Sequence, residues 1–342
     1  MKAQFFCPKC LCRLIKKNNN FICIVCQRKY PVKNKIPIFS NLISEKEFGL
    51  LNIFFEKKIL KYIQKHGTDK LLEFVATFFP ETAKRMNNYL LKIYSYLTLD
   101  KKQNALEIGC GYGNLIKHLC NSYRMVYGVD LNITRLKICK AFLEASKIKN
   151  FKIICTDAFN LPFKDDFFDA IFLIGVFEWI PELYKTEPKL TQMKLLRYLY
   201  RKLSDKGKLI IGIENRYGIQ YFLGRKDHSG LPFTSLMPRF CANIISKFIK
   251  HGPYKTYTYS ALEYTRILHR CGFKKIKIYM ALRSYRFPRF VISLDKTQIK
   301  YFFSNIFIES NKLEKLAAKI FSNLPFPFQR LLAPHFIIVA EK

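Results

Sequence analysis

The sequence lacks any long uninterrupted apolar run, because a Lys, Arg, Asn or acidic residue breaks each hydrophobic stretch. A membrane-spanning helix needs roughly 18 or more such residues, so we expect none here. The opening residues, MKAQFFCPKC, also lack an apolar stretch followed by a small-residue cleavage site, and we expect no secretory signal. These absences favour a cytoplasmic protein that is soluble or held peripherally at the inner face of a membrane.

Acidic residues are scarce. The 342-residue chain has 25 Asp and Glu against 59 Lys and Arg, which gives a formal net charge of +34. Such a charge favours polyanionic partners, namely nucleic acid, anionic lipid or phosphorylated glycan. The chain is also rich in Lys, Ile, Asn and Phe, so a compositional bias explains the charge equally well.

A cysteine pattern typical of a disulfide framework is absent as well. Of the 11 cysteines, five fall within residues 7–26 and six are scattered singly through apolar segments, which favours reduced thiols and one metal site. The cluster contains two CxxC motifs separated by twelve residues: Cys7 with Cys10, and Cys23 with Cys26. Two such knuckles complete a closed tetrahedral Zn²⁺ shell of the structural type. The alternative is a coincidence of buried thiols. Cys12 lies too close to Cys10 to replace it easily.

An extended run with two prolines follows the second knuckle, at residues 30–39. The CPxC knuckle, the second CxxC and the YP-x₄-IP tail resemble the short zinc-ribbon family that activates RNA and protein methyltransferases. Lys35 stands where that family usually has Gly before Ile-Pro, so the turn is expected to differ there. Residues 1–44 hold nine Lys or Arg and no acid, which makes the ribbon either a polyanion-binding surface or simply a solvated basic face.

The chain is predicted to have three parts: a zinc ribbon at 1–44, a helical connector at 45–100 and a catalytic domain at 101–342. The connector is predicted from apolar residues at three- and four-residue intervals, such as Phe55, Ile59 and Tyr62. We expect it either to cover a cofactor or only to pack on the core.

A glycine-rich turn follows the first strand expected in the large domain. Residues 104–114 (NALEIGCGYGN) place glycines where positive φ and a close backbone approach to a ligand are needed. Seventeen residues after Gly113, Asp130 ends a second expected strand, at the position where an acid accepts ribose hydroxyls. A nicotinamide enzyme shares this much of the pattern.

The following motifs distinguish this chain from a nicotinamide enzyme. A third expected strand at 151–155 ends at Thr156-Asp157-Ala158, and L-P-F and F-F-D segments lead into a fourth at 168–175. The combined pattern resembles class I S-adenosylmethionine-dependent methyltransferases of the type 11-like group. The resemblance implies that the methyl donor binds Glu107, Gly109, Gly111, Gly113, Asp130, Leu131, Asp157, Ala158 and Gly175. In it, Asp130 holds the ribose, Asp157 the adenine and the Gly175 carbonyl the ammonium.

The expected fold is therefore α/β: a Rossmann-like, seven-stranded class I methyltransferase sheet with helices on both faces, preceded by the ribbon. The later strands are expected at 208–213, 275–280 and 336–340. Two insertions, about 214–270 and 281–334, separate them and are expected to determine the substrate, because loops at carboxyl strand ends surround the ligand.

The first insertion contains the candidate catalytic residues. His228 is a candidate base, with Glu214 or Asp227 orienting it or raising its basicity. The alternative is that His228 is an ordinary polar turn residue. The string IENRYGIQYFLGRKDHSGLPF, a Tyr-Ser-x-x-Glu segment and a terminal Ala-Pro-x-Phe segment resemble bacterial methyltransferases associated with surface-polysaccharide biosynthesis. Residues 284–288 (SYRFP), which include the basic Arg286, stand where an acidic turn is common in that group, and this leaves the acceptor open.

Three functions stay open at this point. The first is O-methylation of a sugar or phosphate on a glycan or lipid-linked precursor, which the ENR and DHSG segments favour. The second is methylation of rRNA or tRNA held by the basic ribbon, although residues 175–179 (GVFEW) lack the N/D-P-P-Y/F tetrad of many amino-methylating nucleic-acid enzymes. The third is a non-catalytic protein that binds S-adenosylmethionine.

Overall fold

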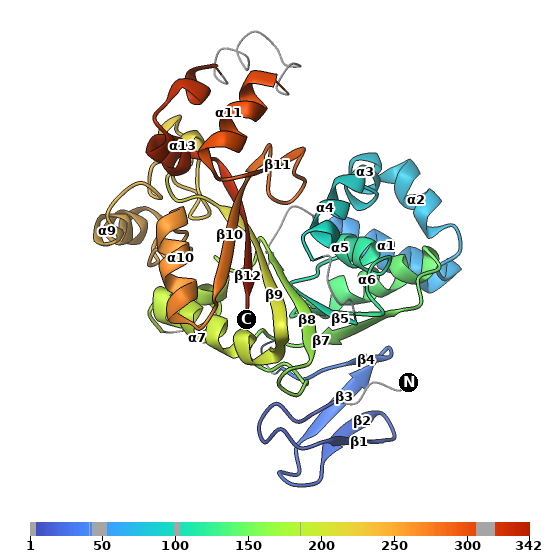
Figure 1. Cartoon of the computed structure of the whole chain (residues 1–342). Helices are drawn as coiled ribbons and strands as arrows, with labels where there is room; N and C mark the ends of the chain where they lie inside the picture. The colour runs from blue at the N-terminus through green and yellow to red at the C-terminus, as the bar shows by residue number, and fades with distance from the viewer. Residues whose placement is uncertain (1–4, 41, 43–52, 99–102, 185, 306–318) are drawn as a thin grey trace. The chain divides into compact units, whose positions relative to one another are not determined.

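A computed structural model describes residues 5–40, 42, 53–98, 103–184, 186–305 and 319–342 (Figure 1). The chain packs as two compact units. Unit 1 is Met1–Phe172 with Arg201–Lys208, and unit 2 is Leu173–Tyr200 with Leu209–Lys342. The part boundaries predicted at residues 44 and 100 stay predictions.

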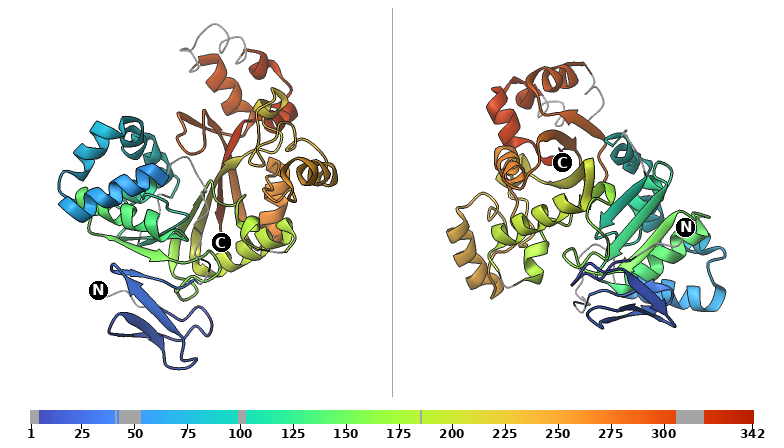
Figure 2. Two further views of the ribbon diagram at one scale, coloured as in Figure 1. Left: turned by 180° about the vertical axis from the view of Figure 1, so that it is seen from behind. Right: turned by 60° about the horizontal axis from the view of Figure 1, so that its bottom comes forward.

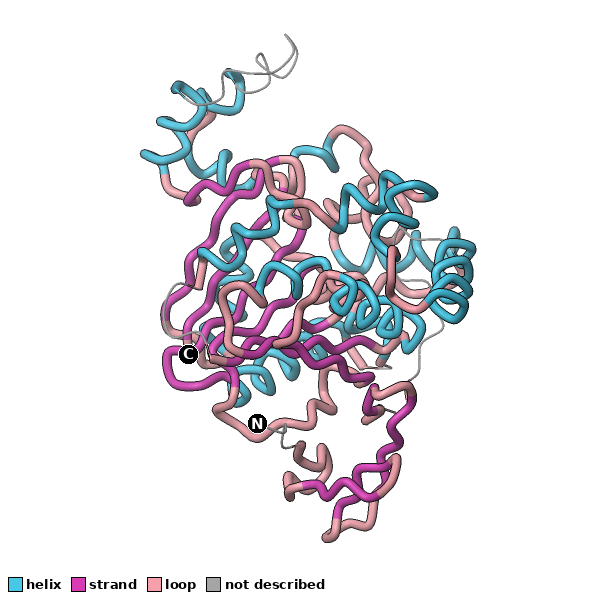
Figure 3. Tube along the Cα trace, turned by 90° about the vertical axis from the view of Figure 1, so that its right-hand side faces the viewer, coloured by secondary structure: helices cyan, strands magenta, loops and turns pink. Residues whose placement is uncertain are grey.

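The first part of unit 1 is a small antiparallel sheet in the order β1-β2-β3-β4. Its strands are β1 (Leu14–Lys17), β2 (Asn20–Cys23), β3 (Lys29–Lys33) and β4 (Ile36–Pro37). It consists of strands and loops alone (Figure 3). Asn34 and Lys35 form the two-residue turn between β3 and β4, with φ of 51° and 62°. Lys35 therefore adopts the left-handed conformation that favours glycine.

Helices fill the described part of the connector. They are α1 (Ile53–His66), α2 (Leu71–Phe78), α3 (Pro80–Met86), η1 (Tyr89–Lys92) and α4 (Ile93–Tyr96). Phe55, Ile59, Leu71 and Val75 are buried against residues 138–142 of α6 (Ile133–Ala145). The apolar spacing that predicted helices thus corresponds to a stripe that packs on the next part of unit 1. Phe48 and Leu51, which begin the same three- and four-residue apolar spacing in the sequence, lie outside the described residues.

Three parallel strands form the Rossmann-like part of unit 1. They are β5 (Asn104–Ile108), β6 (Met125–Asp130) and β7 (Phe151–Cys155). Helices α5 (Asn114–Leu119) and α6 connect them and lie with α1 on one side of these strands (Figure 2). The strands are short apolar runs buried on both faces, as expected for a parallel sheet.

Strands β8 (Phe168–Ile174) and β9 (Leu203–Glu214) contribute residues to both units. Between them come η2 (Ile180–Leu183) and α7 (Pro188–Lys202). The sheet has eight strands in the order β11-β10-β12-β9-β8-β5-β6-β7. The seven predicted strands are present, and the class I α/β fold is confirmed.

The eighth strand, β11 (Phe290–Ser293), comes from the second insertion and pairs antiparallel with β10 (Lys275–Leu282). On its other edge β10 pairs antiparallel with β12 (His335–Glu341). Unit 2 also contains the helices α8 (Ile219–Phe222), α9 (Arg239–Lys250), α10 (Ala261–Arg270), α11 (Lys296–Asn305) and α13 (Phe326–Leu332). None of the helices in the described ranges is long and apolar enough to span a membrane.

Candidate active site

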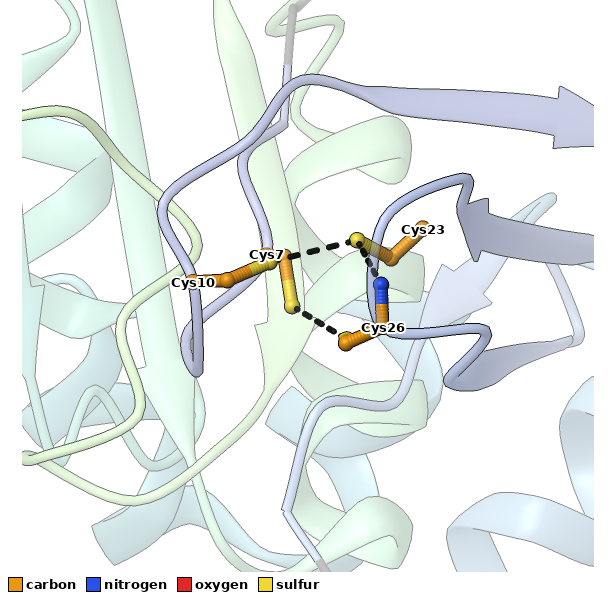
Figure 4. A group of neighbouring side chains, drawn as sticks. All are labelled: Cys7, Cys10, Cys23 and Cys26. Carbon is orange, nitrogen blue, oxygen red and sulfur yellow. Dashed lines mark hydrogen bonds between the residues drawn. The ribbon is translucent and has the colours of Figure 1, made fainter.

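The four cysteines of the two knuckles converge on one point (Figure 4). The Cys7 and Cys26 sulfurs are 3.5 Å apart, and those of Cys10 and Cys23 are 3.3 Å apart. A Zn–S bond of about 2.3 Å implies about 3.8 Å between the sulfurs of a tetrahedral site. All four sulfurs lie within 4.8 Å of one another, so the group is compatible with zinc. Cys12 lies outside it, with its thiol 3.6 Å from the Cys10 carbonyl oxygen.

The segment after the ribbon strands is attached to the edge of the parallel strands. The Phe39 amide donates a 2.8 Å hydrogen bond to the carbonyl of Cys155, the last residue of β7. Ser40 then donates through its hydroxyl to Asp157 Oδ2 at 2.7 Å. On the same face, the Phe5 ring packs edge-on against Phe163. The ribbon is therefore packed against the loop that carries the residue expected at the adenine.

The glycine loop has the backbone that its sequence predicted. Gly109, Gly111 and Gly113 all have positive φ, at 72°, 52° and 83°. The Gly109 amide donates to the Val129 carbonyl at 2.8 Å, which ties the turn to β6. A Cβ atom on Gly113 would lie 2.6 Å from the Cys139 sulfur. Both conformation and space therefore require glycine at this position.

Asp130 closes the loop from the end of β6. Its Oδ2 accepts from the Gly111 amide at 3.0 Å, and its Oδ1 accepts from the Asn132 amide at 2.9 Å. Burial raises the pKa of Asp130, although these two amide donors oppose the shift. The next residue, Leu131, has its carbonyl 3.7 Å from the Cys155 sulfur.

Glu107 is the buried acid at the base of the loop. Its Oε2 has no hydrogen-bond partner among the described residues, and the side chain is almost wholly buried. Burial, and next the charge of Asp130, raise the pKa of Glu107 well above its usual range. A buried carboxylate oxygen without a donor is costly, so this site favours a ligand that supplies one.

Asp157 is buried and well supplied with donors. Its Oδ1 accepts from the Phe159 amide at 2.9 Å, and its Oδ2 accepts from Ser40 and from the Asn160 side-chain amide at 2.8 Å. Ala158 is buried beside it. These bonds hold the Asp157 carboxylate in one orientation.

A second group of side chains, which no sequence motif predicted, connects the helical connector to the glycine loop. Glu56 Oε1 on α1 accepts from the Tyr112 hydroxyl at 2.6 Å and from Arg135 Nε at 3.2 Å. Arg135 and Glu56 are both largely buried. Because Tyr112 lies within the glycine loop, α1 and α6 both restrain that loop.

In unit 2, Gly175 follows directly after β8. Its φ is 68°, and its amide donates to the Gly212 carbonyl of β9 at 2.9 Å. A Cβ atom here would lie 2.8 Å from Arg286 Nε and 3.0 Å from the Tyr285 hydroxyl. The residue therefore has to be glycine, and the guanidinium of Arg286 lies directly against it.

Three side chains of unit 2 converge near this point. Nε2 of His228 is 2.8 Å from Glu214 Oε2 and 3.4 Å from Glu178 Oε1. Glu178 is completely buried, and neither of its carboxylate oxygens has a hydrogen-bond partner among the described residues. The Trp179 ring packs edge-on against the imidazole at 4.8 Å between centroids. Glu178 is a site residue that the sequence analysis missed, because its only signal was one acid after the fourth strand.

Each charged side chain of this cluster shifts the pKa of its neighbours. Burial and then the charge of Glu214 raise the pKa of Glu178 to about 7. Burial would lower the pKa of His228, but the hydrogen bond and charge of Glu214 outweigh it, and the pKa is raised. Burial would likewise raise the pKa of Glu214, but the bond to His228 lowers it. The proton on the imidazole is therefore shared mainly with Glu214.

Asp227, the other candidate partner of His228, is hydrogen-bonded elsewhere. Its Oδ1 accepts from the Ser229 amide at 2.7 Å, and its Oδ2 accepts from the hydroxyls of Thr234 at 2.9 Å and Tyr254 at 3.0 Å. These bonds shape the turn that carries His228. The structure thus brings Glu214 to the imidazole and leaves Asp227 to hold the loop.

The neighbours of Glu214 in the ENR string have structural contacts. The Asn215 side chain donates to the carbonyls of Leu331 and Ala333 at 2.6 and 2.7 Å. Arg216 donates to the carbonyls of Ser235 and Met237 at 3.1 and 2.9 Å. Both residues therefore fix the end of β9, and with it the position of Glu214.

The Tyr-Ser-x-x-Glu segment also has a structural role in the fold. Ser260 and Glu263 form a capping box at the start of α10, in which each side chain binds the other residue's backbone amide. The Tyr259 hydroxyl donates to Gln192 Oε1 at 2.6 Å.

Comparisons with known proteins identify a domain in the middle of the chain. Residues 106–211 match the family described as "Methyltransferase domain". Norajmaline N-methyltransferase of Rauvolfia serpentina is 24% identical over 204 residues, which are 54% of this chain and 69% of that protein. Probable tRNA methyltransferase 9B of Mus musculus is 30% identical over 114 residues, 33% of this chain and 22% of that protein. Residues 106–211 therefore form a methyltransferase domain of the S-adenosylmethionine-dependent class I type.

Among solved structures, a SAM-dependent methyltransferase from Archaeoglobus fulgidus aligns with 85% of this methyltransferase and 100% of its own chain, at a TM-score of 0.41 and 17% identity. The aligned part of the chain spans 69% of the length of the first of these two curated relatives and 22% of the length of the second.

The residues of the methyltransferase fit its methyl donor. The ammonium and hydroxyl groups of S-adenosylmethionine can donate hydrogen bonds to buried acids. Glu107 Oε2 accepts no hydrogen bond from the described residues and could accept one from such a group. The positive φ of Gly109 and Gly111 leaves the backbone open to close approach. The individual roles of these residues stay predictions.

Proposed function

We propose that this methyltransferase O-methylates a saccharide hydroxyl or a phosphate group on a glycan or a lipid-linked precursor. The observation that carries the proposal is the 2.8 Å contact between His228 Nε2 and Glu214 Oε2. Glu214 lies two residues after Gly212, whose carbonyl accepts from the Gly175 amide. S-adenosylmethionine supplies an already activated methyl group, so the protein has to align the acceptor and, for a hydroxyl, remove a proton.

His228 is suited to take that proton. Its Nε2–H donates to Glu214, which leaves Nδ1 as the basic nitrogen of the ring. The new O–CH₃ bond would form as the donor's S–CH₃ bond breaks, with S-adenosylhomocysteine as the leaving group. The acceptor's O–H bond breaks in the same step, and its proton passes to Nδ1. The carboxylate of Glu214 then stabilises the resulting imidazolium, as an acid does in other acid-histidine pairs.

Arg286 supports an acceptor that carries phosphate. Its guanidinium lies against Gly175. Burial would lower the pKa of Arg286, but the neighbouring Tyr285 and then the charge of Glu178 outweigh it, and the pKa is raised. A planar guanidinium binds phosphate oxygens in pairs. A phosphate acceptor is already anionic and needs no base, so it would use Arg286 rather than His228.

We propose in addition that Cys7, Cys10, Cys23 and Cys26 hold one structural Zn²⁺. The support is the convergence of four sulfurs at distances that suit tetrahedral coordination, with no position left for water.

RNA is the second candidate substrate. The nine Lys or Arg residues in 1–44, with no acid, favour it, and a probable tRNA methyltransferase is among the relatives. The non-catalytic alternative is disfavoured by the Glu214–His228 pair, for which a scaffold has no use.

One experiment separates these candidates. Purified protein and radiolabelled S-adenosylmethionine are incubated with polysaccharide, lipid-linked saccharide, protein and RNA fractions, and His228→Ala serves as a parallel sample. Label in a saccharide fraction that mild acid glycan cleavage releases is the expected result. Label that ribonuclease releases would replace the saccharide with RNA. Label in saccharide that His228→Ala leaves unchanged would assign the phosphate acceptor.

A further inference from the structure

Helix α9 exposes its large apolar side chains and buries its small ones. Phe240, Ile244 and Phe248 are 69%, 50% and 79% exposed, and their spacing of four residues places them along one side. Ala242 and Ser246, on the opposite side, are buried. A helix that packs on a core buries the larger side chains instead. The row of Phe240, Ile244 and Phe248, here called the apolar row, is therefore exposed to solvent.

The surroundings of the apolar row are basic. From residue 228 to residue 262 the chain has no Asp or Glu. Lys247 and Lys250 are exposed on α9, and Lys247 lies next to the row at 100° per residue. Aromatic residues flanked by lysines are typical of helices that lie in the interface of an anionic membrane.

A pocket adjoins the start of the row. It has a volume of about 370 Å³, and Arg239, Phe240, Lys255 and Tyr257 line it with Glu187 and five other residues. Phe240 thus belongs to both the row and the pocket. The two features form one continuous surface.

The pocket is lined by an arginine, one nitrogen of which lacks a hydrogen-bond partner in the part of the chain that the structure describes. The Arg239 guanidinium lies over the Tyr257 ring at 4.3 Å and donates through Nη2 to the Thr258 carbonyl. Its Nη1 is buried and has no hydrogen-bond partner among the described residues. The carboxylate of Glu187 is already used, because it accepts from two backbone amides at the start of α7, those of Lys189 and Leu190. An anionic oxygen is the partner that Nη1 lacks.

We propose that α9 and this pocket bind the surface of an anionic phospholipid bilayer. The apolar row enters the interface, a lipid phosphate lies against Arg239 and Lys255, and Lys247 and Lys250 contact neighbouring headgroups. A second copy of the chain fits less well as the occupant, because a symmetric contact would bring Lys247 and Lys250 against their own copies. The proposal does not depend on methyl transfer.

The test is sedimentation of the full chain with vesicles. Vesicles of equal parts phosphatidylcholine and phosphatidylglycerol should carry the protein down, and phosphatidylcholine alone should carry far less. Phe240→Ser with Phe248→Ser should reduce the binding constant more than tenfold, since each ring loses burial in the interface. Lys247→Gln with Lys250→Gln should reduce it about fivefold per lysine, and added salt should do the same.

Matched controls come from unit 1. Tyr89→Ser with Tyr96→Ser removes two aromatic rings that are 70% and 61% exposed, and Lys61→Gln with Lys65→Gln removes two exposed lysines. Both controls should bind as the wild type does. Lys255→Gln probes the pocket without touching the row and should weaken phosphatidylglycerol binding selectively.

Three results would overturn the proposal. One is absence of wild-type binding to the anionic vesicles, and another is equal losses in the α9 variants and their controls. The third is a wild-type dimer in solution that Phe240→Ser with Phe248→Ser converts to monomer, because the row would then be covered by a second copy. Circular dichroism of each variant shows that a loss of binding is not a loss of fold.

Discussion

The hydroxyl of Ser40 donates a 2.7 Å hydrogen bond to the carboxylate of Asp157. Ser40 comes directly after the ribbon strands, and Asp157 is the residue expected at the adenine of the methyl donor. The adjacent backbone bond from Phe39 to Cys155 holds the two segments in register. The ribbon therefore helps to position the loop that carries Asp157. Loss of metal from the ribbon should change the position of the Asp157 carboxylate.

Ser40→Ala should weaken binding of S-adenosylhomocysteine and lower stability. The variant leaves a buried Asp157 oxygen short of one donor, which should reduce the free energy of unfolding by about 1–3 kcal/mol. Calorimetric titration and chemical denaturation measure the two effects. Ser122→Ala, a half-buried serine of the same unit, is the control. Unchanged affinity in Ser40→Ala would mean that Asp157 is held without the ribbon.

Cys10→Ser should release the metal from the ribbon while the parallel strands stay folded, because those strands have their own core. Elemental analysis measures the zinc, and circular dichroism measures the remaining fold. Cys12→Ser is the matched control and should keep the metal, since its sulfur lies outside the group of four. Wild-type protein that contains no metal after careful preparation would exclude the zinc site.

The sequence predicted the strands well because each is a short apolar run bounded by a turn, and burial on both faces imposes that pattern. Strand β11 was missed. It pairs with β10 through Phe290–Ser293, which is too short to be distinguished from the loop of an insertion. The turn at Lys35 kept its left-handed form without glycine, because a two-residue hairpin imposes that φ.

The candidate site was only partly predictable. Glu214 and His228 stood out because each lies in a recognisable string. Glu178 and Arg286 did not, since they come from distant segments and meet only through the packing of unit 2. The Glu56–Tyr112–Arg135 group was invisible for the same reason: side-chain contacts across 79 residues of chain leave no local pattern.

Asp130→Ala should weaken binding of the methyl donor by about 1.5–3 kcal/mol if the carboxylate accepts two ribose hydroxyls. The variant also deprives the Gly111 and Asn132 amides of their acceptor. Asp130→Asn separates the two effects, because its amide oxygen still accepts one of these bonds. Calorimetry that finds undiminished affinity in Asp130→Ala would point to a different cofactor site.

His228→Ala should lower turnover on a hydroxyl acceptor by about 10²–10⁴-fold and leave methyl-donor affinity nearly intact. His228 acts as a base only when its imidazole is neutral. Because the pKa of His228 is raised above 6.5, turnover should still be rising with pH above pH 6.5. Glu214→Gln removes the main cause of the raised pKa and should shift the rising limb to lower pH. A pH–rate profile of each variant measures this. A limb that stays in place in Glu214→Gln would show that the pair does not handle the proton.

Glu178→Gln tests the second carboxylate through stability rather than turnover. The folded pKa of about 7 lies above the ordinary 4.5, so the neutral acid is the form that the fold favours. Its contribution to stability is complete below pH 4.5 and is lost as pH rises through 7. Glu178→Gln stays neutral at every pH. As pH rises from 4.5 to 8, the free energy of unfolding of Glu178→Gln should therefore increase relative to that of the wild type, by up to about 3 kcal/mol. Urea denaturation of both proteins across this range measures the difference. Parallel curves would mean that Glu178 stays ionised in the fold, held by His228 and Arg286.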